Sequence, residues 1–420
     1  MSQPSFPAGA ARAPASSSRM VAAGMVFMTL MPLAMWLANR STPLLLGLAA
    51  FCFTAAAALV PEGLRRSSAR LRLLVSTPLG IVLSAFLIWS LASILWSHGP
   101  AASLHGWAEL ALPIAFTLVI AASGRFSPSP VWLRALAVAI ILACLLCIVE
   151  LASGLSQRAA LGIGKLMGFV FNRPAITALV LGVPVIHGLW SLPTRRSSDR
   201  LLAMVVGLAV AALALRSESA SARLGLAVCV LCWPAALLWP RMTRRAIGSA
   251  FVLTMLLAPV LGMLAQNYMP SALLKRLPPM TGQARIEIWE SFGQAARSRP
   301  LFGTGFDTSP TLDRHPVAAQ VEPERRRLLA VGHPHDMPLQ AWVETGAVGA
   351  ILMTLAGLLL LTRLGRMPAR EAAPRLALAA ACFAISVVGH GAWQGWWIAV
   401  LGASILWFPA HRERQGEHHG

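Results

Sequence analysis

Long apolar stretches recur along this 420-residue chain, and they constrain its fold more than any other feature. A helix needs about 20 apolar residues, each rising 1.5 Å, to cross the roughly 30 Å of hydrocarbon in a bilayer. Twelve such stretches can be marked, at 20–38, 43–60, 73–96, 104–122, 131–151, 174–192, 201–215, 222–239, 247–266, 339–361, 376–393 and 395–409. Only 12% of the residues are charged, against about 25% in soluble domains. We therefore expect an all-α polytopic membrane protein of about 12 transmembrane helices.

Positive charges between the stretches predict the orientation, because Arg and Lys beside spans are retained on the cytoplasmic side. If residues 1–19 lie inside, twenty arginines fall in the inside segments. Apart from one long loop, the outside segments hold only Arg40, Arg158, Lys165, Arg173, Arg216 and Arg223. The net charge of +19 is thus explained largely by topology, and we expect no nucleic-acid partner.

This orientation divides the chain into five parts. Residues 1–19 and 410–420 are expected to be cytoplasmic tails, and the first span is expected to stay uncleaved. Spans one to nine occupy 20–266, and spans ten to twelve occupy 339–409. The segment 267–338 between them lies outside, and it is too long to be a simple connector, so we expect it to carry short helices.

Two C-x-x-C pairs, Cys144 with Cys147 and Cys229 with Cys232, resemble zinc ligands. Both pairs lie inside uninterrupted apolar stretches without polar neighbours, which favours buried cysteines that act as small hydrophobic residues. Aspartate is scarce, and no paired-Asp motif occurs in an outside segment. We therefore expect no metal.

The long outside loop contains the sequence GQARIEIWESFGQAARSRPLFGTGF, which predicts an amphipathic helix followed by a turn. Arg285, Trp289, Phe292 and Ala296 share one face of this helix. Arg285 then lies at the edge of an apolar face, suited either to a cavity or to an interfacial helix from which its charged end reaches water.

The same loop ends in GHPHDMPLQAWVETG, where Pro338 fits the first turn of span ten and Asp336 or Met337 the cap. His335 therefore stands at the mouth of a helix on the outer side. The partial positive charge of the helix N-terminus lowers the pKa of an imidazole and keeps it neutral, as a base requires. Gln340 and Glu344 follow one turn apart. A purely structural histidine is the alternative.

A third polar element is the short hairpin RSESASAR between spans seven and eight, on the same outer side. Arg216 and Arg223 stand at its ends with Glu218 between them. The two guanidinium groups suit a phosphate head group, although a salt-bridge cluster of the three residues would also close the hairpin. Since the span interiors are almost free of charge, the pattern favours a surface site for a lipid-linked anion over the conduction path of a transporter.

Three motifs in this order resemble the O-antigen ligase and polymerase superfamily of bacterial inner-membrane glycosyltransferases, over about 213–361. They are SARLGLAV with Arg223, the R-x-x-x-W of Arg285 and Trp289 followed by PLFGTGF, and the H-D of His335 and Asp336 followed by L-Q-x-W-x-E-x-G-x-x-G. The resemblance departs from the family at Ala222, where Ser is frequent, and at Asp336, where Asn is frequent. Asp336 either orients His335 or raises its pKa.

The resemblance implies transfer of O-antigen polysaccharide from undecaprenyl pyrophosphate to the lipid A-core at the periplasmic face of the inner membrane, without a cofactor. In an inverting displacement, Arg216, Arg223 and Arg285 would stabilise the departing pyrophosphate and His335 would accept the proton of the acceptor hydroxyl. His333, Asp336, Gln340, Glu344 and Trp289 would support them. An O-antigen polymerase of the same superfamily and a non-enzymatic lipid or polysaccharide transporter remain as alternatives.

Overall fold

A computed structural model describes residues 14–164, 166–193, 196–276, 282–389 and 391–409. Most of the two predicted cytoplasmic tails, and Lys165, lie outside these residues. The described chain contains helices and no strand. Ten helices are long and apolar enough to cross a membrane, and two shorter apolar helices, Thr42–Ala58 and Gly395–Trp407, accompany them. The predicted all-α polytopic fold is confirmed, whereas the count of twelve spans stays a prediction.

The helices of the first half are α1 (Ala15–Leu37), α2 (Thr42–Ala58), α3 (Gly63–Val75), α4 (Pro78–Ala92), α5 (Pro100–Ser123), α6 (Pro130–Ala152), α7 (Ser156–Ala160), α8 (Asn172–Trp190) and α9 (Ser197–Arg216). Those of the second half are α10 (Ala220–Leu238), α11 (Pro240–Leu257), α12 (Leu261–Tyr268), α13 (Ser271–Arg276), α14 (Ala284–Ser298), α15 (Met337–Leu364), α16 (Ala369–Val388) and α17 (Gly395–Trp407). Short 3₁₀ turns join several of them.

Several predicted boundaries were wrong, and the reasons are local. The expected span 73–96 splits, because Thr77 caps a new helix through its bond from the Gly80 amide, and Pro78 occupies the first position. The expected span 247–266 starts earlier, at Pro240, and bends where Pro259 interrupts the helix. The expected span 376–393 instead runs from Ala369 to Val388, so Trp393 lies in a break between α16 and α17.

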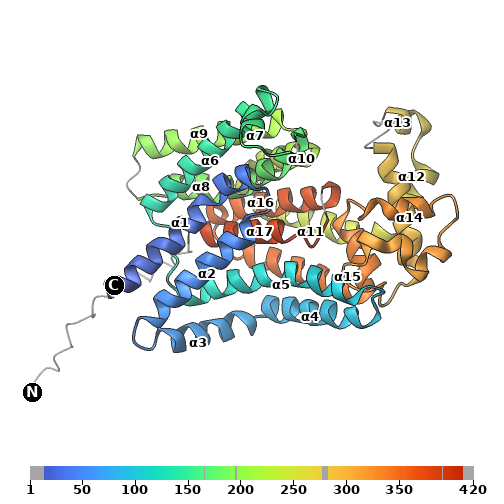
Figure 1. The fold of residues 1–420 in the computed structure, drawn as a ribbon, viewed down its shortest axis with the longest axis horizontal. Helices are drawn as coiled ribbons and strands as arrows, with labels where there is room; N and C mark the ends of the chain where they lie inside the picture. The colour runs from blue at the N-terminus through green and yellow to red at the C-terminus, as the bar shows by residue number, and fades with distance from the viewer. Residues whose placement is uncertain (1–13, 165, 194–195, 277–281, 390, 410–420) are drawn as a thin grey trace, which may run out of the picture.

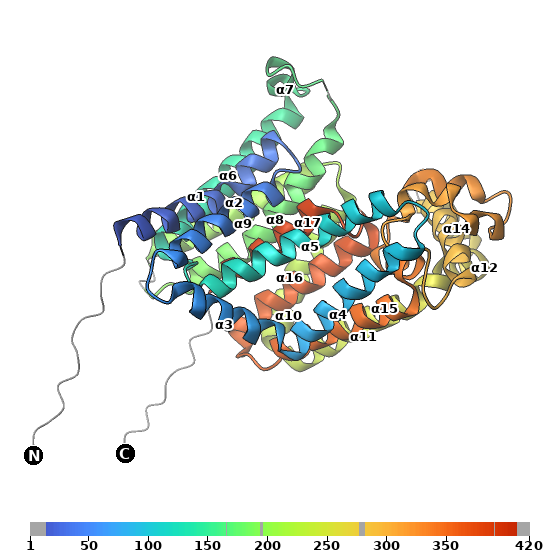
Figure 2. The ribbon, with the colours of Figure 1, turned by 60° about the horizontal axis from the view of Figure 1, so that its bottom comes forward.

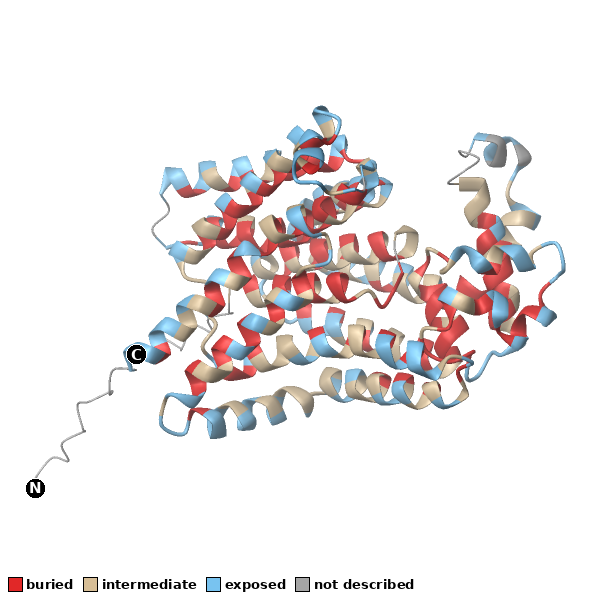
Figure 3. Ribbon diagram, in the orientation of Figure 1, coloured by how far each residue is buried: buried red, intermediate tan, exposed pale blue. Residues whose placement is uncertain are grey.

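Helix α8 occupies the centre of the bundle. In the most apolar part of α8, 78% of the residues are buried, whereas the corresponding value for α4 is 17%. Helix α4 therefore presents most of its surface outward, as Figure 3 shows. The main core packs methionines and alanines of α1 and α2 against α6, α8 and α9. A lipid-facing helix stays apolar on its outer surface, which is why exposed and buried faces of α4 have similar composition.

The segment between α11 and α15 forms a separate lobe at one end of the bundle. In Figures 1 and 2, α12 and α14 lie at the end opposite the first turn of α1. The lobe has its own small core, in which Phe292 of α14 packs with Leu312, Leu329 and Leu339. This lobe, with the start of α15, is one wall of the candidate site.

Candidate active site

A cavity of about 1230 Å³ opens between the lobe and the ends of several long helices. Its walls come from segments far apart in the sequence: the α1–α2 connection, the stretch from α7 to the start of α8, the start of α10, the start of α14, the loop before α15 and the break after α16. Residues at the start of the lobe helix α14 and at the start of α10 therefore line the same cavity. No short sequence window contains such a site.

Five arginines line the cavity, namely Arg40, Arg158, Arg173, Arg223 and Arg285. Among the described residues that line the cavity, Glu218 is the one carboxylate. Within the described residues, no carboxylate lies within 4.0 Å of any of these five guanidinium groups. The cavity therefore carries an excess of positive charge that the protein does not neutralise, which suits an anionic ligand.

Helix N-termini add to this positive charge. The cavity is lined by Asn172 and Arg173 in the first turn of α8, by Ser221 and Arg223 in the first turn of α10, and by Arg285 in the first turn of α14. The unpaired amides and the partial positive charge at a helix N-terminus favour phosphate groups. Residues near the N-terminal ends of three helices thus line one cavity.

Two of the arginines are held in place by the protein. Arg158 of α7 is 6% exposed, donates to the carbonyl oxygen of Trp36 at 3.2 Å, and stacks over the Phe171 ring at 4.8 Å. Arg173 donates to Oε1 of Gln394 at 3.5 Å and lies over the Trp396 ring. Fixed guanidinium groups lose little freedom when an anion binds.

The hairpin at the start of α10 separates the two arginines that the sequence left equivalent. Arg223 lines the cavity, whereas Arg216 is exposed at the end of α9 and does not line it. The ion-pair cluster of Arg216, Glu218 and Arg223 does not form, since none of these pairs lies within 4.0 Å. Glu218 packs against the Gly168 backbone instead.

The same hairpin is closed by serines. Ser219 accepts a bond from the Ala222 amide at 3.0 Å and caps α10. Ala222, where the family often has Ser, is fully buried. A hydroxyl there would face apolar neighbours rather than the cavity.

His335 lines the cavity beside His333 and Arg285. Its Nδ1 lies 3.0 Å from the Gly389 carbonyl oxygen. A carbonyl only accepts, so Nδ1 carries the hydrogen and Nε2 keeps a free lone pair. Burial lowers the pKa of His335 below its ordinary value, and the nearby Arg285 charge lowers it further, while the Gly389 bond acts in the opposite direction. The neutral imidazole expected from the sequence thus follows mainly from burial.

The loop that carries His335 is strained and braced. His335 adopts φ 54°, a left-handed conformation that is uncommon for residues other than glycine. Its amide donates to Nδ1 of His333 at 3.3 Å, and the two rings lie 4.2 Å apart between centroids. Trp289 of α14 donates through Nε1 to the Pro334 carbonyl oxygen at 3.1 Å. Trp289 therefore ties the lobe helix to the histidine loop.

Asp336 fills one role that the sequence predicted for it, the helix cap, and neither of the two roles expected of it toward His335. Its Oδ1 accepts the Leu339 amide at 2.9 Å and caps α15, as one of the two predicted caps. It forms no hydrogen bond with His335. Burial raises the pKa of Asp336 to about 7, and its charge is not among the causes that shift the pKa of His335. Asp336 positions the helix start rather than the ring.

Gln340 and Glu344 do not line the cavity; they form a buried network behind it. Oε1 of Glu344 accepts from Nε2 of Gln340 at 2.9 Å, and its Oε2 accepts from the Trp393 indole at 2.6 Å and the Asp307 amide at 2.7 Å. Gln340 in turn accepts the Ala392 amide through Oε1 at 2.9 Å. Both residues thus hold the break between α16 and α17.

That break is the segment 389–395, of which every residue except 390 is described. Two of its residues contact residues of the cavity: the Gly389 carbonyl oxygen bonds His335, and the Gln394 side chain bonds Arg173. In addition, the Gly395 amide donates to Glu109 of α5 at 3.2 Å. Burial raises the pKa of Asp307, beside this network, to about 8, with Glu344 and Glu109 adding to the shift. The segment 389–395 therefore holds both His335 and Arg173 in place.

The PLFGTGF motif, residues 300–306, packs against α15 at a break in this helix and forms hydrogen bonds with its backbone there. Gly346 has φ 64° inside this helix and interrupts it. The amides of Thr304 and Gly305 donate to the carbonyl oxygens of Val343 and Glu344 at 2.8 and 3.0 Å, replacing bonds that the helix lost. A Cβ on Gly346 would collide with the backbone of Leu301. The motif is structural, and it fixes the first turns of α15.

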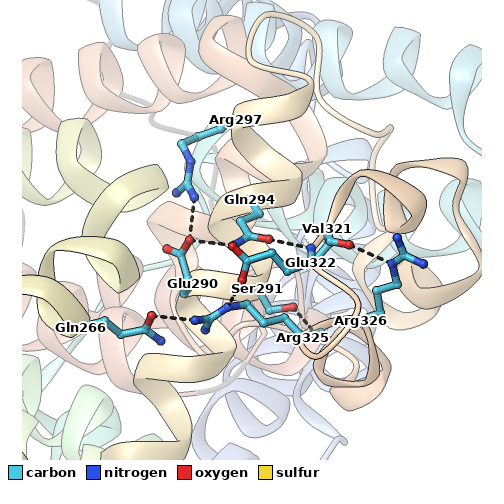
Figure 4. A network of polar contacts seen from close by, with 9 residues as sticks. All are labelled: Gln266, Glu290, Ser291, Gln294, Arg297, Val321, Glu322, Arg325 and Arg326. Atoms are coloured by element: carbon cyan, nitrogen blue, oxygen red, sulfur yellow. Dashed lines mark hydrogen bonds and ion pairs between the residues drawn. The ribbon is translucent and has the colours of Figure 1, made fainter.

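A second polar network attaches the remainder of the lobe to α14, as Figure 4 shows. Arg297 donates to Glu290 at 2.7 Å, and Gln294 accepts the Glu322 amide at 3.0 Å. Arg325 bridges Glu322 and Gln266, at 2.7 and 3.0 Å. None of these side chains lines the cavity, so the network stabilises the lobe without touching the candidate site.

The sequence missed Arg40, Arg158, Arg173 and Gln394 as site residues. Three of these four are arginines counted on the outer side, where the orientation predicted few positive charges. Arginines on the side where positive charges are rare could have indicated an anion-binding site. Cys144, Cys147, Cys229 and Cys232 are unbonded and lie away from the cavity. Among the described residues, no three His, Cys, Asp or Glu side chains are grouped as metal ligands would be.

Comparison with known families adds an independent observation. Residues 202–354 match the family model described as O-Antigen ligase. The cavity residues in the matched segment include Arg223, Arg285 and His335, but not Arg40, Arg158 or Arg173. A search of curated proteins finds no match. The family match supports the O-antigen ligase superfamily, and the apolar helices agree with a multi-pass membrane protein.

Proposed function

We propose that this chain, related to the O-antigen ligase superfamily through residues 202–354, transfers O-antigen polysaccharide from undecaprenyl pyrophosphate to the lipid A-core at the periplasmic face of the inner membrane. The observation that carries the proposal is one cavity lined by His335 and by five arginines, none of which forms an ion pair with a described carboxylate. Similarity to this superfamily indicates a glycosyltransferase-like enzyme in O-antigen processing.

The donor pyrophosphate binds among the arginines. Arg223 and Arg285 lie at the first turns of α10 and α14, and Arg158 and Arg173 come from α7 and the first turn of α8. Arg216 is not part of this group, because it does not line the cavity. The apolar side chains of Leu37, Phe169 and Ile176 also line the cavity, and they suit the polyprenyl chain.

Transfer is an in-line displacement at the anomeric carbon. The acceptor hydroxyl oxygen forms a bond to this carbon while the bond to the pyrophosphate oxygen breaks, and the electron pair leaves with the pyrophosphate. Nε2 of His335 takes the hydroxyl proton, for which its free lone pair and lowered pKa are suited. The guanidinium groups stabilise the charge on the leaving group, a role that metal ions fill in other transferases. The reaction so written inverts the configuration and needs no cofactor.

The supporting residues act through position. Trp289 holds the loop at Pro334, and Gln340 and Glu344 hold the break that carries Gly389. His333 accepts the His335 amide and faces the same cavity, where it is placed to contact the acceptor. Misplacement of a reacting group by about 1 Å costs on the order of 10²-fold in rate, so these contacts matter to catalysis.

The test is deletion of the gene followed by electrophoresis of lipopolysaccharide. We expect loss of the polymer ladder with accumulation of lipid-linked polymer, and restoration by the wild-type gene. Core carrying a single repeat unit would indicate the polymerase reaction instead. Loss of the ladder with lipid-linked glycan retained on the cytoplasmic side would indicate a transporter, and an unchanged ladder would refute the proposal. Purified protein should transfer glycan in the presence of EDTA.

A further inference from the structure

A second cavity, of about 650 Å³, lies between α11 and α15 far from the candidate site. Helix α15 starts beside His335 and ends at Leu364, with an interruption at Gly346. The part after this break, residues 347–364, is by itself about 27 Å long at 1.5 Å per residue. The groove follows the far end of this part. It is lined by the side chains of Arg244 and Arg245 at one end and by apolar residues along its length.

The length of the groove is apolar and faces outward. Leu253 is 56% exposed and Leu358 is 36% exposed, and Val252 completes the wall. Gly248 forms the floor, where an added Cβ would meet the nearest atoms of Leu361 and Leu358 only at 3.6 and 3.9 Å. A side chain larger than a methyl group at Gly248 would therefore enter the groove. A surface of this kind, on helices that cross a membrane, meets acyl chains rather than water.

The mouth of the groove carries positive charge without a protein partner. Arg244 is half-buried, with its guanidinium against Gly365 at the end of α15, and Arg245 is exposed. Within the described residues, no carboxylate lies within 4.0 Å of either arginine. Arg241, Arg363 and Arg366 stand at the same ends of the two helices. A phosphate group at the mouth would therefore meet only cations.

We propose that this groove binds an anionic phospholipid, whose phosphate pairs with Arg244 and Arg245 and whose acyl chain lies along Val252, Leu253 and Leu358. The charge at the mouth selects a lipid with net negative charge over a zwitterionic one, because the described residues that line the groove include no acidic side chain to pair with a choline or ethanolamine. The lining includes the hydroxyl residues Ser249 and Thr362, but its apolar side chains offer a surface that an acyl chain can cover and free phosphate cannot, which favours a lipid as the occupant. The site is separate from the reaction proposed above, and its test does not depend on that reaction.

Native mass spectrometry of the full chain in detergent micelles tests the proposal. Phosphatidylglycerol should remain bound at concentrations where phosphatidylcholine does not. Arg244→Gln with Arg245→Gln should weaken phosphatidylglycerol binding by more than about tenfold, from a loss of roughly fivefold per arginine near a lipid head group. Gly248→Leu should weaken it comparably with both charges intact, because the added side chain fills the floor. If Gly248→Leu fails to fold, Val252→Phe fills the same groove from its wall.

The matched control is Arg241→Gln, which removes a charge one turn away on α11 but outside the groove; it should bind as the wild type does. Should the double arginine variant fold poorly, Arg245→Gln alone, at an exposed position, should still show the fivefold loss. Equal binding of phosphatidylcholine, equal loss in Arg241→Gln, or full binding by the groove-filling variants would each overturn the proposal. Displacement of the lipid by equimolar inorganic phosphate would assign the site to free phosphate and overturn it as well.

Discussion

Nδ1 of His335 lies 3.0 Å from the carbonyl oxygen of Gly389, which is 54 residues further along the chain. This contact sets the tautomer of the ring, and so decides which nitrogen can accept a proton. Gly389 belongs to the break between α16 and α17, which Gln340 and Glu344 hold from α15. The chemistry proposed for His335 therefore depends on residues that never reach the cavity.

Replacement of His335 by Ala should reduce transfer by about 10²–10⁴-fold, the usual contribution of a general base. Transfer of labelled glycan by purified protein measures it, with size-exclusion profiles to show that the variant folds. His105→Ala serves as the control, because the His105 side chain is 80% exposed and does not line the cavity. Near-wild-type transfer by His335→Ala would remove this residue from the mechanism.

Arg223→Gln and Arg216→Gln should behave differently, although the sequence places both arginines in one hairpin. Arg223 lines the cavity and Arg216 does not. Loss of one cation that stabilises a leaving group costs about 10²-fold in kcat, so we expect that loss for Arg223→Gln and less than about threefold for Arg216→Gln. Measured kcat values for the two variants decide the matter, and the reverse order would contradict the assignment.

The pH profile should carry the signature of a neutral imidazole. Burial and Arg285 lower the pKa of His335, so kcat/KM should fall with decreasing pH only below the ordinary histidine value of about 6.5. Arg285→Gln removes a positive charge that disfavours imidazolium. The pKa of His335 then rises, and the acid limb should move to higher pH.

Arg314→Gln, an exposed change in the same lobe and outside the cavity, is the control for this shift. It should leave the acid limb where the wild type has it. An acid limb that stays in place in Arg285→Gln would show that another group titrates.

Exchange of two residues in the buried network should distinguish position from charge. Glu344→Gln sets an amide donor against the Nε2 donor of Gln340, so one buried hydrogen bond is lost. We expect about a tenfold fall in kcat with an unchanged KM, because the break and His335 shift. The double variant Gln340→Glu with Glu344→Gln restores complementary donors and acceptors, since the new carboxylate can accept the Ala392 amide. Failure of the double variant to recover activity would point to a direct role for the Glu344 charge.

Gly346→Ala should destabilise the fold strongly. The residue has φ 64°, and a Cβ would collide with the Leu301 backbone. Gly162→Ala is the matched control, because Gly162 has φ 68° with nothing within 4 Å of an added Cβ. The control should lose only the roughly 1 kcal/mol of an unfavourable backbone conformation, whereas Gly346→Ala should lose about 3 kcal/mol or more. Thermal unfolding in detergent measures the stability of both variants. Equal losses of stability would show that the contact between the PLFGTGF motif and α15 does not depend on Gly346.

The amino-acid sequence by itself determined the membrane class, the helical content and the approximate positions of the spans. These follow from apolar length, because a bilayer imposes the same requirement on every crossing segment regardless of its neighbours. The cap at Asp336 and the helix of Arg285 and Trp289 were likewise predictable, since capping and helical periodicity depend on residues a few positions apart.

Only the tertiary structure decided which of the polar residues share a cavity. Arg158 and Arg173 come from the α7–α8 region, Arg285 from the lobe, and Gly389 from the α16–α17 break. Their proximity depends on how α8 packs at the centre of the bundle, and no local pattern encodes such a contact. For the same reason Arg216 and Arg223 looked alike in the sequence: where each side chain lies depends on the helix that carries it and on what that helix packs against.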